Sequence, residues 1–436
     1  MNILVIAGDG IGGTEKAAIL FAGELARRGH RVIAQVSEGT PRVVDFLAAG
    51  GEVASFAYTA HSIESTIRKH AIHLVHQHVS GYGDHRELYV ALDHLGDQRP
   101  KLIETNVFGH LLDFHDRGHV DFRMFVSLTS GLQAFRRTRI KGLLPDPKQN
   151  SVLFNPLDPQ NITEQDDINQ VFRKRLGVGY DECLVIRIGR PGHKWTCWEC
   201  DAFAKARRFN SKLRMLLMEP AQPICEAISQ GVYGEGIIVQ KATSDLTYIN
   251  KVYRAADLMM HASSFGESFG YTVAEAMMSE LPLITLATPW GDNAQTELVK
   301  HNETGYICGS VGGMAKALVK LASDEAMRVQ MGQAGRNHIM AMTSLIHETD
   351  LLEEIILCVM GGQPGPLMTQ RFNAWQEYNR QGYSSASRKR YEADCHLPLS
   401  LLAGRLYETA RCIKTVKRYF KLKSKGRSVA FPSLRF

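Results

Sequence analysis

The sequence predicts an α/β protein of two domains, each built on a parallel β-sheet that helices cover on both faces. The chain has 436 residues, about three times the length of a typical domain. Short apolar segments alternate with amphipathic helical segments in both halves of the chain. We therefore expect a first domain over residues 1–160, a second over 161–348, a helix over 349–360 that crosses back to the first domain, and a tail over 361–436.

The first domain opens as a βαβ unit. An apolar strand at 2–7 leads into a glycine-rich turn at 8–13, a helix that ends near Gly29, and a second strand at 31–36. Further strands, with helices between them, are expected at 72–76, 101–103, 124–127 and 151–154. The polar stretch over residues 161–169 is expected to be the linker.

The second domain repeats this alternation. We expect strands at 183–188, 213–218, 236–240 and 257–263, helices at 199–208, 222–230, 246–255 and 271–279, and a further strand near 280–284. Helices near 311–323 and 325–340 complete the domain. Two such halves place ligand-binding loops at the carboxyl ends of their strands.

Bulk properties limit the class of protein. No run of about 18 apolar residues is present, and the first strand has no basic leader, so we expect a cytoplasmic protein without a spanning helix or signal peptide. Eight cysteines spread through a long chain are typical of reduced thiols. Cys197 and Cys200 form the one close pair, and two packed thiols are favoured over a zinc or redox site because no second pair stands at ligand spacing.

Positive charge is concentrated in the tail. Residues 361–436 hold fifteen Lys or Arg and four Asp or Glu, a net +11 against +6 for the whole chain, so the first 360 residues are net −5. Residues 402–420 read as a helix with one apolar and one basic face. One interpretation is that this helix docks on an anionic membrane surface, and the other is that it packs on the body of the protein. Nucleic acid is not an expected partner because no base-reading module accompanies the tail.

The most informative segment runs from Glu267 to Glu275. It reads Glu-Ser-Phe-Gly-Tyr-Thr-Val-Ala-Glu, with the first carboxylate on a turn after a short strand and the second one turn into a helix. A helix start offers free backbone N–H groups, which bind phosphate. Together with two carboxylates, they form a place suited to phosphate and sugar hydroxyls.

Flanking segments identify this pattern. Val185 to Lys194 reads Val-Ile-Arg-Ile-Gly-Arg-Pro-Gly-His-Lys, Glu280 begins a Glu-Leu-Pro-Leu-Ile strand, and Asn302 begins an Asn-Glu-Thr-Gly-Tyr turn. The order and spacing of these pieces over residues 180–340 resemble the retaining glycosyltransferases of family 4, also called group 1. The resemblance implies the GT-B fold, in which two Rossmann-like domains face each other across a cleft.

The resemblance also implies roles for individual residues. Arg190 and Lys194 would stabilise charge on the donor diphosphate in place of a metal, although their spacing is one residue shorter than is usual in the family. Glu267 would contact the transferred sugar, and Glu275 would accept hydrogen bonds from the ribose hydroxyls. The remaining donor contacts would be backbone N–H groups of Ser268, Phe269 and Gly270.

The glycine loop of the first domain has three possible roles. Gly8, Gly10 and Gly13 satisfy a dinucleotide-binding pattern after a strand, and Glu38 stands loosely where a nicotinamide site needs its acidic residue. In the resembled family a similar loop, here with Gly12 and Gly13, lies near the donor phosphates and the acceptor. A structural tight turn is the third alternative.

Three further polar residues are candidates for sugar or acceptor contacts. The family often carries a His on a loop of the first domain, where this chain has Asn106 and, four residues later, His110. His78 follows another strand, and it is one of 17 histidines. Glu104 could be an active-site carboxylate or a buried partner for one of these imidazoles.

The predicted function is therefore transfer of a hexose-type sugar from a nucleotide diphosphate sugar, UDP preferred and GDP next, to a glycan or lipid-linked saccharide, with retention. No metal site and no cofactor are expected. Two alternatives stay open: a catalytically silent nucleotide-sugar-binding subunit, and an NAD-dependent oxidoreductase that uses the Gly8–Gly13 loop. The expected location is the cytoplasm, with peripheral docking on the membrane if the tail binds lipid.

Overall fold

A computed structural model gives the fold of the chain. It describes residues 1–7, 12–35, 43–80, 85–111, 118–138, 145–157, 167–189, 194–241, 243, 245–288 and 291–381. The chain divides into two compact units, and each is described by itself. Within the described residues, unit 1 comprises 1–156 and 343–381, and unit 2 comprises 157–342.

Unit 1 is built on a seven-stranded sheet in the order β3-β2-β1-β4-β5-β6-β7, and all of its paired strands are parallel. Parallel neighbours need crossover connections, and helices supply them. The strands are β1 (Asn2–Ile6), β2 (Arg31–Gln35), β3 (Glu52–Val53), β4 (Leu74–Val79), β5 (Lys101–Asn106), β6 (Phe122–Phe125) and β7 (Asn150–Val152). The helices are α1 (Gly13–Arg27), α2 (Val43–Ala48), α3 (Ala60–Lys69), α4 (Arg86–Leu95), the short 3-10 helix η1 (Gly96–Gln98), α5 (Leu128–Thr138), α14 (Leu345–Val359) and α15 (Pro366–Gln381).

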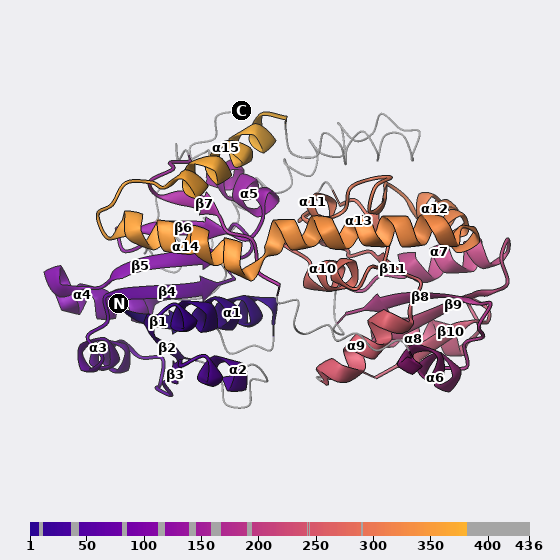
Figure 1. Ribbon diagram of the computed structural model, residues 1–436, viewed down its shortest axis with the longest axis horizontal. Coiled ribbons are helices and arrows are strands. Elements are labelled where there is room, and N and C mark those ends of the chain that lie inside the picture. Colours follow the sequence, from indigo (N-terminus) through magenta and orange to yellow (C-terminus); the bar gives the residue numbers. More distant parts are fainter. Residues whose placement is uncertain are drawn as a thin grey trace, which may run out of the picture. The chain divides into compact units, whose positions relative to one another are not determined.

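Helices cover both faces of this sheet (Figure 1). Alternate residues of a strand point to opposite faces, so Ile3 and Val5 pack with α1 and α14, and Leu4 packs with α3 and α4. All three side chains are fully or almost fully buried. The near-continuous apolar strands read from the sequence are therefore those of a sheet covered on two sides.

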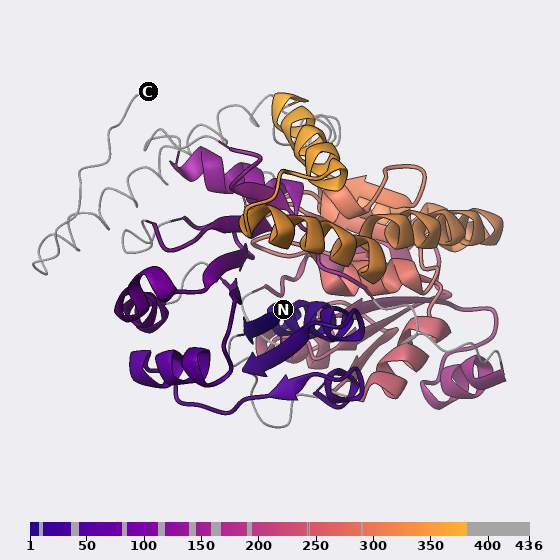
Figure 2. The same cartoon turned by 60° about the vertical axis from the view of Figure 1, so that its left-hand side comes forward.

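The end of the described chain belongs to the core of unit 1. Glu348 of α14 is fully buried, accepts the Phe154 N–H at 2.8 Å, and pairs with Arg371 of α15 at 2.5 Å. Trp375 of α15 is also fully buried, and its ring leaves no room for a side chain at Gly131. Figure 2 shows α15 folded back beside α14. The sequence expectation assigned residues 366–381 to a basic tail, whereas these contacts make them part of the domain. The amphipathic helix expected over 402–420 lies outside the described residues.

Unit 2 has a six-stranded parallel sheet in the order β10-β9-β8-β11-β12-β13. Its strands are β8 (Cys183–Ile188), β9 (Leu213–Met218), β10 (Ile237–Gln240), β11 (Leu258–His261), β12 (Leu283–Leu286) and β13 (Gly305–Cys308). Its helices are α6 (Asp167–Arg175), α7 (Trp198–Arg207), α8 (Gln222–Ser229), α9 (Leu246–Ala255), α10 (Tyr271–Met278), α11 (Gln295–Leu298), α12 (Val311–Ser323) and α13 (Glu325–Thr343).

The order of strands in unit 2 determines which loops meet. Strands β8 and β11 are adjacent and parallel, with Leu258 opposite Val185. Because both strands run in the same direction, the loop after β8 and the loop after β11 emerge at the same edge of the sheet. Lys194 is carried by the first loop and Glu267 by the second.

Candidate active site

The turn that carries Glu267 is fixed to the segment after β12. Gly266 has φ +71, and a Cβ there would lie 1.4 Å from the Asp292 carbonyl oxygen, so only glycine fits. Two backbone hydrogen bonds join the segments, from the Asp292 N–H to the Phe265 carbonyl and from the Ala294 N–H to the Glu267 carbonyl, both at 2.8 Å. The backbone of Glu267 is thereby held in place.

A buried glutamine strengthens this attachment. The Glu267 N–H donates to Oε1 of Gln295 at 3.0 Å. Nε2 of Gln295 donates in turn to the Leu286 carbonyl at 3.0 Å and to Oγ1 of Thr288 at 2.9 Å. Gln295 is fully buried, so its amide links the turn to the end of β12 without competition from water.

The Glu267 carboxylate is held between two basic side chains. Nζ of Lys194 lies 2.7 Å from Oε2, and Nε2 of His261, the last residue of β11, lies 3.2 Å from Oε1. The side chain of Glu267 is 14% exposed, that of Lys194 is 40% exposed, and that of His261 is 1% exposed. One neighbour is therefore accessible to solvent and the other is not.

The electrostatics of this group follow from burial and charge. Burial raises the pKa of Glu267, but the charge of Lys194 and the nearby imidazole outweigh it and lower the pKa to about 2. Burial, together with the charge of Arg187, lowers the pKa of His261. At neutral pH the site therefore holds a carboxylate, an ammonium group and a neutral imidazole.

A buried ion pair supports the same edge of the sheet. Nε of Arg187 donates to Oε1 of Glu199 at 2.8 Å, and the same oxygen accepts the Ala262 N–H at 2.9 Å. The guanidinium also lies 4.7 Å from the ring centre of Trp195. These contacts connect β8, the start of α7 and the end of β11. Arg190, predicted beside Lys194, lies outside the described residues.

The predicted donor-binding residues lie at the start of α10. Gly270 is the N-cap with φ +102, Ser268 is buried, and Phe269 is buried with its ring edge-on to Tyr271 at 5.2 Å. Gly270 has no side chain, so no side-chain hydrogen bond caps α10. The start of a helix is a typical place for an anion.

Glu275 lies one turn into α10, where it has a partner that the sequence did not indicate. The hydroxyl of Tyr253, in α9, donates to Oε2 of Glu275 at 3.0 Å. Tyr253 is almost fully buried, and burial, together with the neighbouring Glu275 charge, raises the pKa of its phenol well above the ordinary value. One carboxylate oxygen of Glu275 is therefore oriented by a neutral hydroxyl donor.

In unit 1 the glycine turn and a histidine pair occupy the carboxyl-terminal edge of the sheet. Gly12 is the N-cap of α1 and Gly13 its first residue; Gly8 and Gly10 lie outside the described residues. The rings of His76 and His78 have centres 4.2 Å apart, and their planes are tilted by 37°. Nε2 of His76 is 2.9 Å from Oγ1 of Thr105, whereas neither ring nitrogen of His78 has a hydrogen-bond partner among the described residues. Burial lowers the pKa of both imidazoles, that of His76 to about 3.

Asn106 and His110 form a closed turn. The Asn106 amide donates to the His110 carbonyl at 3.1 Å, and its oxygen accepts the His110 N–H at 3.2 Å. The same amide donates to Glu104 at 3.2 Å. Glu104 also accepts from Gln77 at 3.0 Å and from Arg123 at 3.2 Å, so its partners are these three side chains and not an imidazole.

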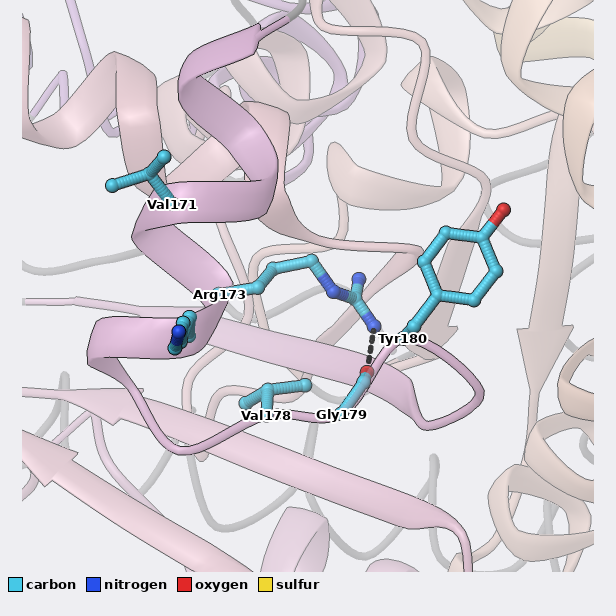
Figure 3. Close-up of a pocket in the computed structure, with 6 residues that line it drawn as sticks. Val171, Arg173, Val178, Gly179 and Tyr180 are labelled. Carbon is cyan, nitrogen blue, oxygen red and sulfur yellow. Dashed lines mark hydrogen bonds between the residues drawn. The ribbon is translucent and has the colours of Figure 1, made fainter.

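A separate pocket of about 380 Å³ lies beside α6 (Figure 3). Its lining includes Val171, Val178 and Tyr180, and the guanidinium of Arg173 donates to the Gly179 carbonyl at 3.3 Å. These residues precede β8, so the pocket is at the amino-terminal edge of the sheet. Ligands of parallel sheets bind at the opposite edge, and this pocket is not part of the candidate site.

The described residues offer neither a cluster of metal ligands nor a helix that could span a membrane. No group of three or more His, Cys, Asp or Glu side chains in that part of the chain could hold a metal ion. Among the helices described, none is long and apolar enough to cross a membrane.

Part of the chain matches a known protein family. Residues 223–338 match the family described as glycosyl transferases group 1, whereas no curated protein matches the sequence. This stretch contains the Glu267 turn, α10 and Gln295. The match confirms the predicted family resemblance and the prediction that the chain is a glycosyltransferase.

Solved structures confirm the fold class. HepE from Anabaena, in complex with UDP and glucose, has a TM-score of 0.66 at 16% identity and covers 82% of this chain and 99% of its own. A glycosyltransferase from Rickettsia africae has a TM-score of 0.67 at 15% identity, with 83% and 99% covered. WaaG, a glycosyltransferase involved in lipopolysaccharide biosynthesis, has 0.55 at 15% identity, with 83% and 100% covered. The fold is that of GT-B glycosyltransferases.

Four residues of this site were not singled out from the sequence: His261, Gln295, Tyr253 and the buried Glu199. A His at the end of an apolar strand and a Tyr in an amphipathic helix are common in any core. The signal that could have identified them is position: His261 ends the strand that leads to the Glu267 turn, and Tyr253 belongs to the helix before it.

Proposed function

We propose that this chain moves a hexose-type sugar from a nucleotide diphosphate sugar, UDP preferred and GDP next, to a hydroxyl of a glycan or lipid-linked saccharide. Transfer proceeds with retention at the anomeric carbon and without a metal ion. The observation that carries the proposal is the contact of Lys194 with Glu267, a cation and a carboxylate brought to 2.7 Å at the carboxyl-terminal edge of a parallel sheet. The HepE structures with UDP and with UDP-glucose support UDP as the donor nucleotide.

Each residue has a stated part in the donor complex. Lys194, with Arg190, offsets the charge that develops on the β-phosphate as the bond from the anomeric carbon to the phosphate oxygen breaks. The start of α10 is proposed to bind the same diphosphate. Gly12 and Gly13, at the start of α1, are proposed as further backbone contacts to the donor. Glu267 accepts hydrogen bonds from the sugar hydroxyls.

Glu275, whose Oε2 accepts the Tyr253 hydroxyl, receives the ribose hydroxyls on its carboxylate. In the transfer step the acceptor oxygen bonds to the anomeric carbon on the face that the phosphate leaves. The proton of the acceptor hydroxyl passes to the departing phosphate oxygen, so no protein nucleophile is required. The protein contributes position and charge.

Unit 1 is proposed to bind the acceptor. His78 is its best-placed polar contact because its ring nitrogens have no partner among the described residues. The Asn106 amide and the His110 backbone bind each other, and the His110 imidazole is the proposed contact from that turn. The acceptor is a glycan or lipid-linked saccharide, and the basic residues beyond 381 would bring the enzyme to an anionic membrane surface.

A thermal-shift panel with UDP, GDP, ADP and NAD tests the proposal, with release of nucleotide from UDP-glucose measured beside it in excess EDTA. Stabilisation by one nucleoside diphosphate and slow release of that nucleotide from its sugar, unaffected by EDTA, are the expected results. Stabilisation by NAD alone would replace the proposal with an oxidoreductase. Binding with no release, even over long incubation, would indicate a silent binding subunit.

A further inference from the structure

The two neighbours of the Glu267 carboxylate differ in how firmly they are held. Lys194 is on a loop, with a long side chain that is 40% exposed. His261 is the last residue of β11, where it lies opposite Thr285 of β12, and its side chain is 1% exposed. The Lys194 side chain can move away from the carboxylate without any unfolding of the protein, whereas the His261 side chain cannot.

We infer that His261 is a positioning residue that keeps the Glu267 carboxylate in its sugar-binding orientation after Lys194 has turned to the donor diphosphate. The inference rests on the proposed function and deepens it. In the ligand-free chain Lys194 is 2.7 Å from Oε2 of Glu267. A diphosphate carries more negative charge than one carboxylate, so the exposed ammonium group exchanges partners when the donor binds.

After that exchange Glu267 retains one side-chain neighbour among the described residues. Nε2 of His261 is 3.2 Å from Oε1, a short contact that does not have the angle of a hydrogen bond while Lys194 is paired with Oε2. A neutral imidazole next to a carboxylate donates from the facing nitrogen, so Nε2 carries the proton and Nδ1 does not. Neither ring nitrogen has a hydrogen-bond partner in the described part of the chain, so no other contact competes with Glu267 for the ring orientation.

The surroundings of His261 hold the ring where it is. The residue after it, Ala262, has both backbone groups bound: its N–H donates to Glu199 at 2.9 Å, and its carbonyl accepts from Arg187 at 3.1 Å. Glu199 and Arg187 pair with each other at 2.8 Å in the interior of unit 2. The anchor for Glu267 therefore belongs to the rigid edge of the sheet, which is the support that a preorganised sugar contact needs.

Loss of the His261 imidazole is expected to affect the turnover of the sugar donor and not the binding of the nucleotide. Glu267 is proposed to contact the sugar, and the nucleotide is bound by α10 and Glu275. Loss of the imidazole should therefore leave the affinity for UDP within about 2-fold and lower turnover of UDP-glucose by about 10- to 100-fold, the effect of one hydrogen bond to a charged group. A purely structural role would weaken both ligands together.

The test compares His261→Phe, His261→Gln and His261→Asn in the full chain. Calorimetry with UDP and with UDP-glucose gives the two affinities, and release of UDP from UDP-glucose gives kcat and KM without a known acceptor; GDP and GDP-mannose take their place if the nucleotide panel selects GDP. Glutamine places its amide N–H where Nε2 stands and should recover most of the activity. Asparagine places it near Nδ1 and should not.

The matched control is His301→Phe. His301 precedes β13, at the opposite edge of the same sheet, where its Nδ1 accepts the Ile307 N–H at 3.0 Å. Its loss should lower thermal stability and leave the ratio of the two affinities unchanged. If His261→Phe does not fold, the Gln and Asn variants make the same comparison.

Two results would overturn the inference alone: turnover in His261→Phe equal to that of the wild type, or equal losses with UDP and UDP-glucose in all three variants. Failure of the proposed function would look different. In that case the Glu267→Gln variant would bind UDP-glucose and turn it over as the wild type does.

Discussion

Two largely buried carboxylates, Glu104 in unit 1 and Glu267 in unit 2, occupy the carboxyl-terminal edges of their sheets and are used differently. Glu104 is 4% exposed, and Gln77, Asn106 and Arg123 all donate to it. Glu267 has two neighbours, and the ammonium group of Lys194 is open to solvent. A carboxylate that is fully hydrogen-bonded inside the protein holds the fold together, and one whose partner can leave is available to a ligand.

The largest expected effect sharpens this comparison in unit 2. Glu267→Gln removes the negative charge and replaces one acceptor oxygen of the proposed sugar contact with an N–H donor. We expect the rate of nucleotide release from the donor sugar to fall about 10²- to 10³-fold. The free energy of unfolding should also fall, because the lowered pKa of Glu267 means that its charge stabilises the folded state, so turnover is compared per folded molecule. Steady-state kinetics and thermal melts measure the two quantities. A variant that loses stability but keeps turnover would reverse the roles assigned to the two carboxylates.

The matched change in unit 1 is Glu104→Gln. In this variant the N–H group of the side-chain amide faces one of the three side chains that donate to Glu104. The guanidinium of Arg123 also loses its carboxylate partner. We expect the free energy of unfolding to fall by about 2 kcal/mol, with turnover per folded molecule within about 3-fold of the wild type. Urea denaturation gives the first quantity. An unchanged denaturation midpoint would show that Glu104 is not the structural member of the pair.

How far the sequence predicts these elements depends on the kind of signal. The bounds of β8, β9, α9 and α12 agree with the expectation, because a continuous apolar strand and an amphipathic helix with an Asp or Ser N-cap are local patterns. Helix α14 begins at Leu345 instead of 349, since Ser344 caps it. The packing of α15 could not be read, because the Gly-Pro run before it is equally typical of a linker and of a turn.

The site shows the same division. Glu267 and Glu275 were found because the motif is contiguous, and Lys194 because its loop follows the adjacent strand. His261, Tyr253 and Gln295 act through three-dimensional contacts with that motif, and each residue type is ordinary in a buried position. The distances that connect them to Glu267 or Glu275, from 3.0 to 3.2 Å, exist only after folding.

Protonation extends the comparison to the histidines of unit 1. Burial lowers the pKa of His78 and His76, so below pH 6.5 the unfolded chain takes up protons that the folded chain does not. The stability that they contribute is complete above about pH 6.5 and is lost as the pH falls, by about 1.4 kcal/mol per pH unit for each residue. His78→Leu should therefore flatten the fall of the melting temperature between pH 6.5 and 5.5. An equally steep curve in this variant would contradict the neutral, buried state of His78.

The smallest expected effect concerns the ribose contact. Tyr253→Phe removes the hydroxyl that orients Glu275, and we expect the Kd for the nucleoside diphosphate to rise about 5-fold, the equivalent of about 1 kcal/mol. Tyr248→Phe is the control on the same helix, since its hydroxyl donates to Gln240 at 3.4 Å and not to Glu275. Calorimetry distinguishes the two variants. Equal weakening in both would assign the effect to α9 as a whole.

The central claim is that the loop edge of unit 2 holds a donor diphosphate, and Lys194 tests it most directly. The measurement is the Kd of the nucleoside diphosphate that stabilises the wild type most, compared in the full-length wild type, Lys194→Ala, and Lys241→Ala as a control. The account predicts a Kd at least about 10-fold higher in Lys194→Ala alone, the loss of one charge-assisted contact to phosphate. Equal affinity in all three proteins would contradict it.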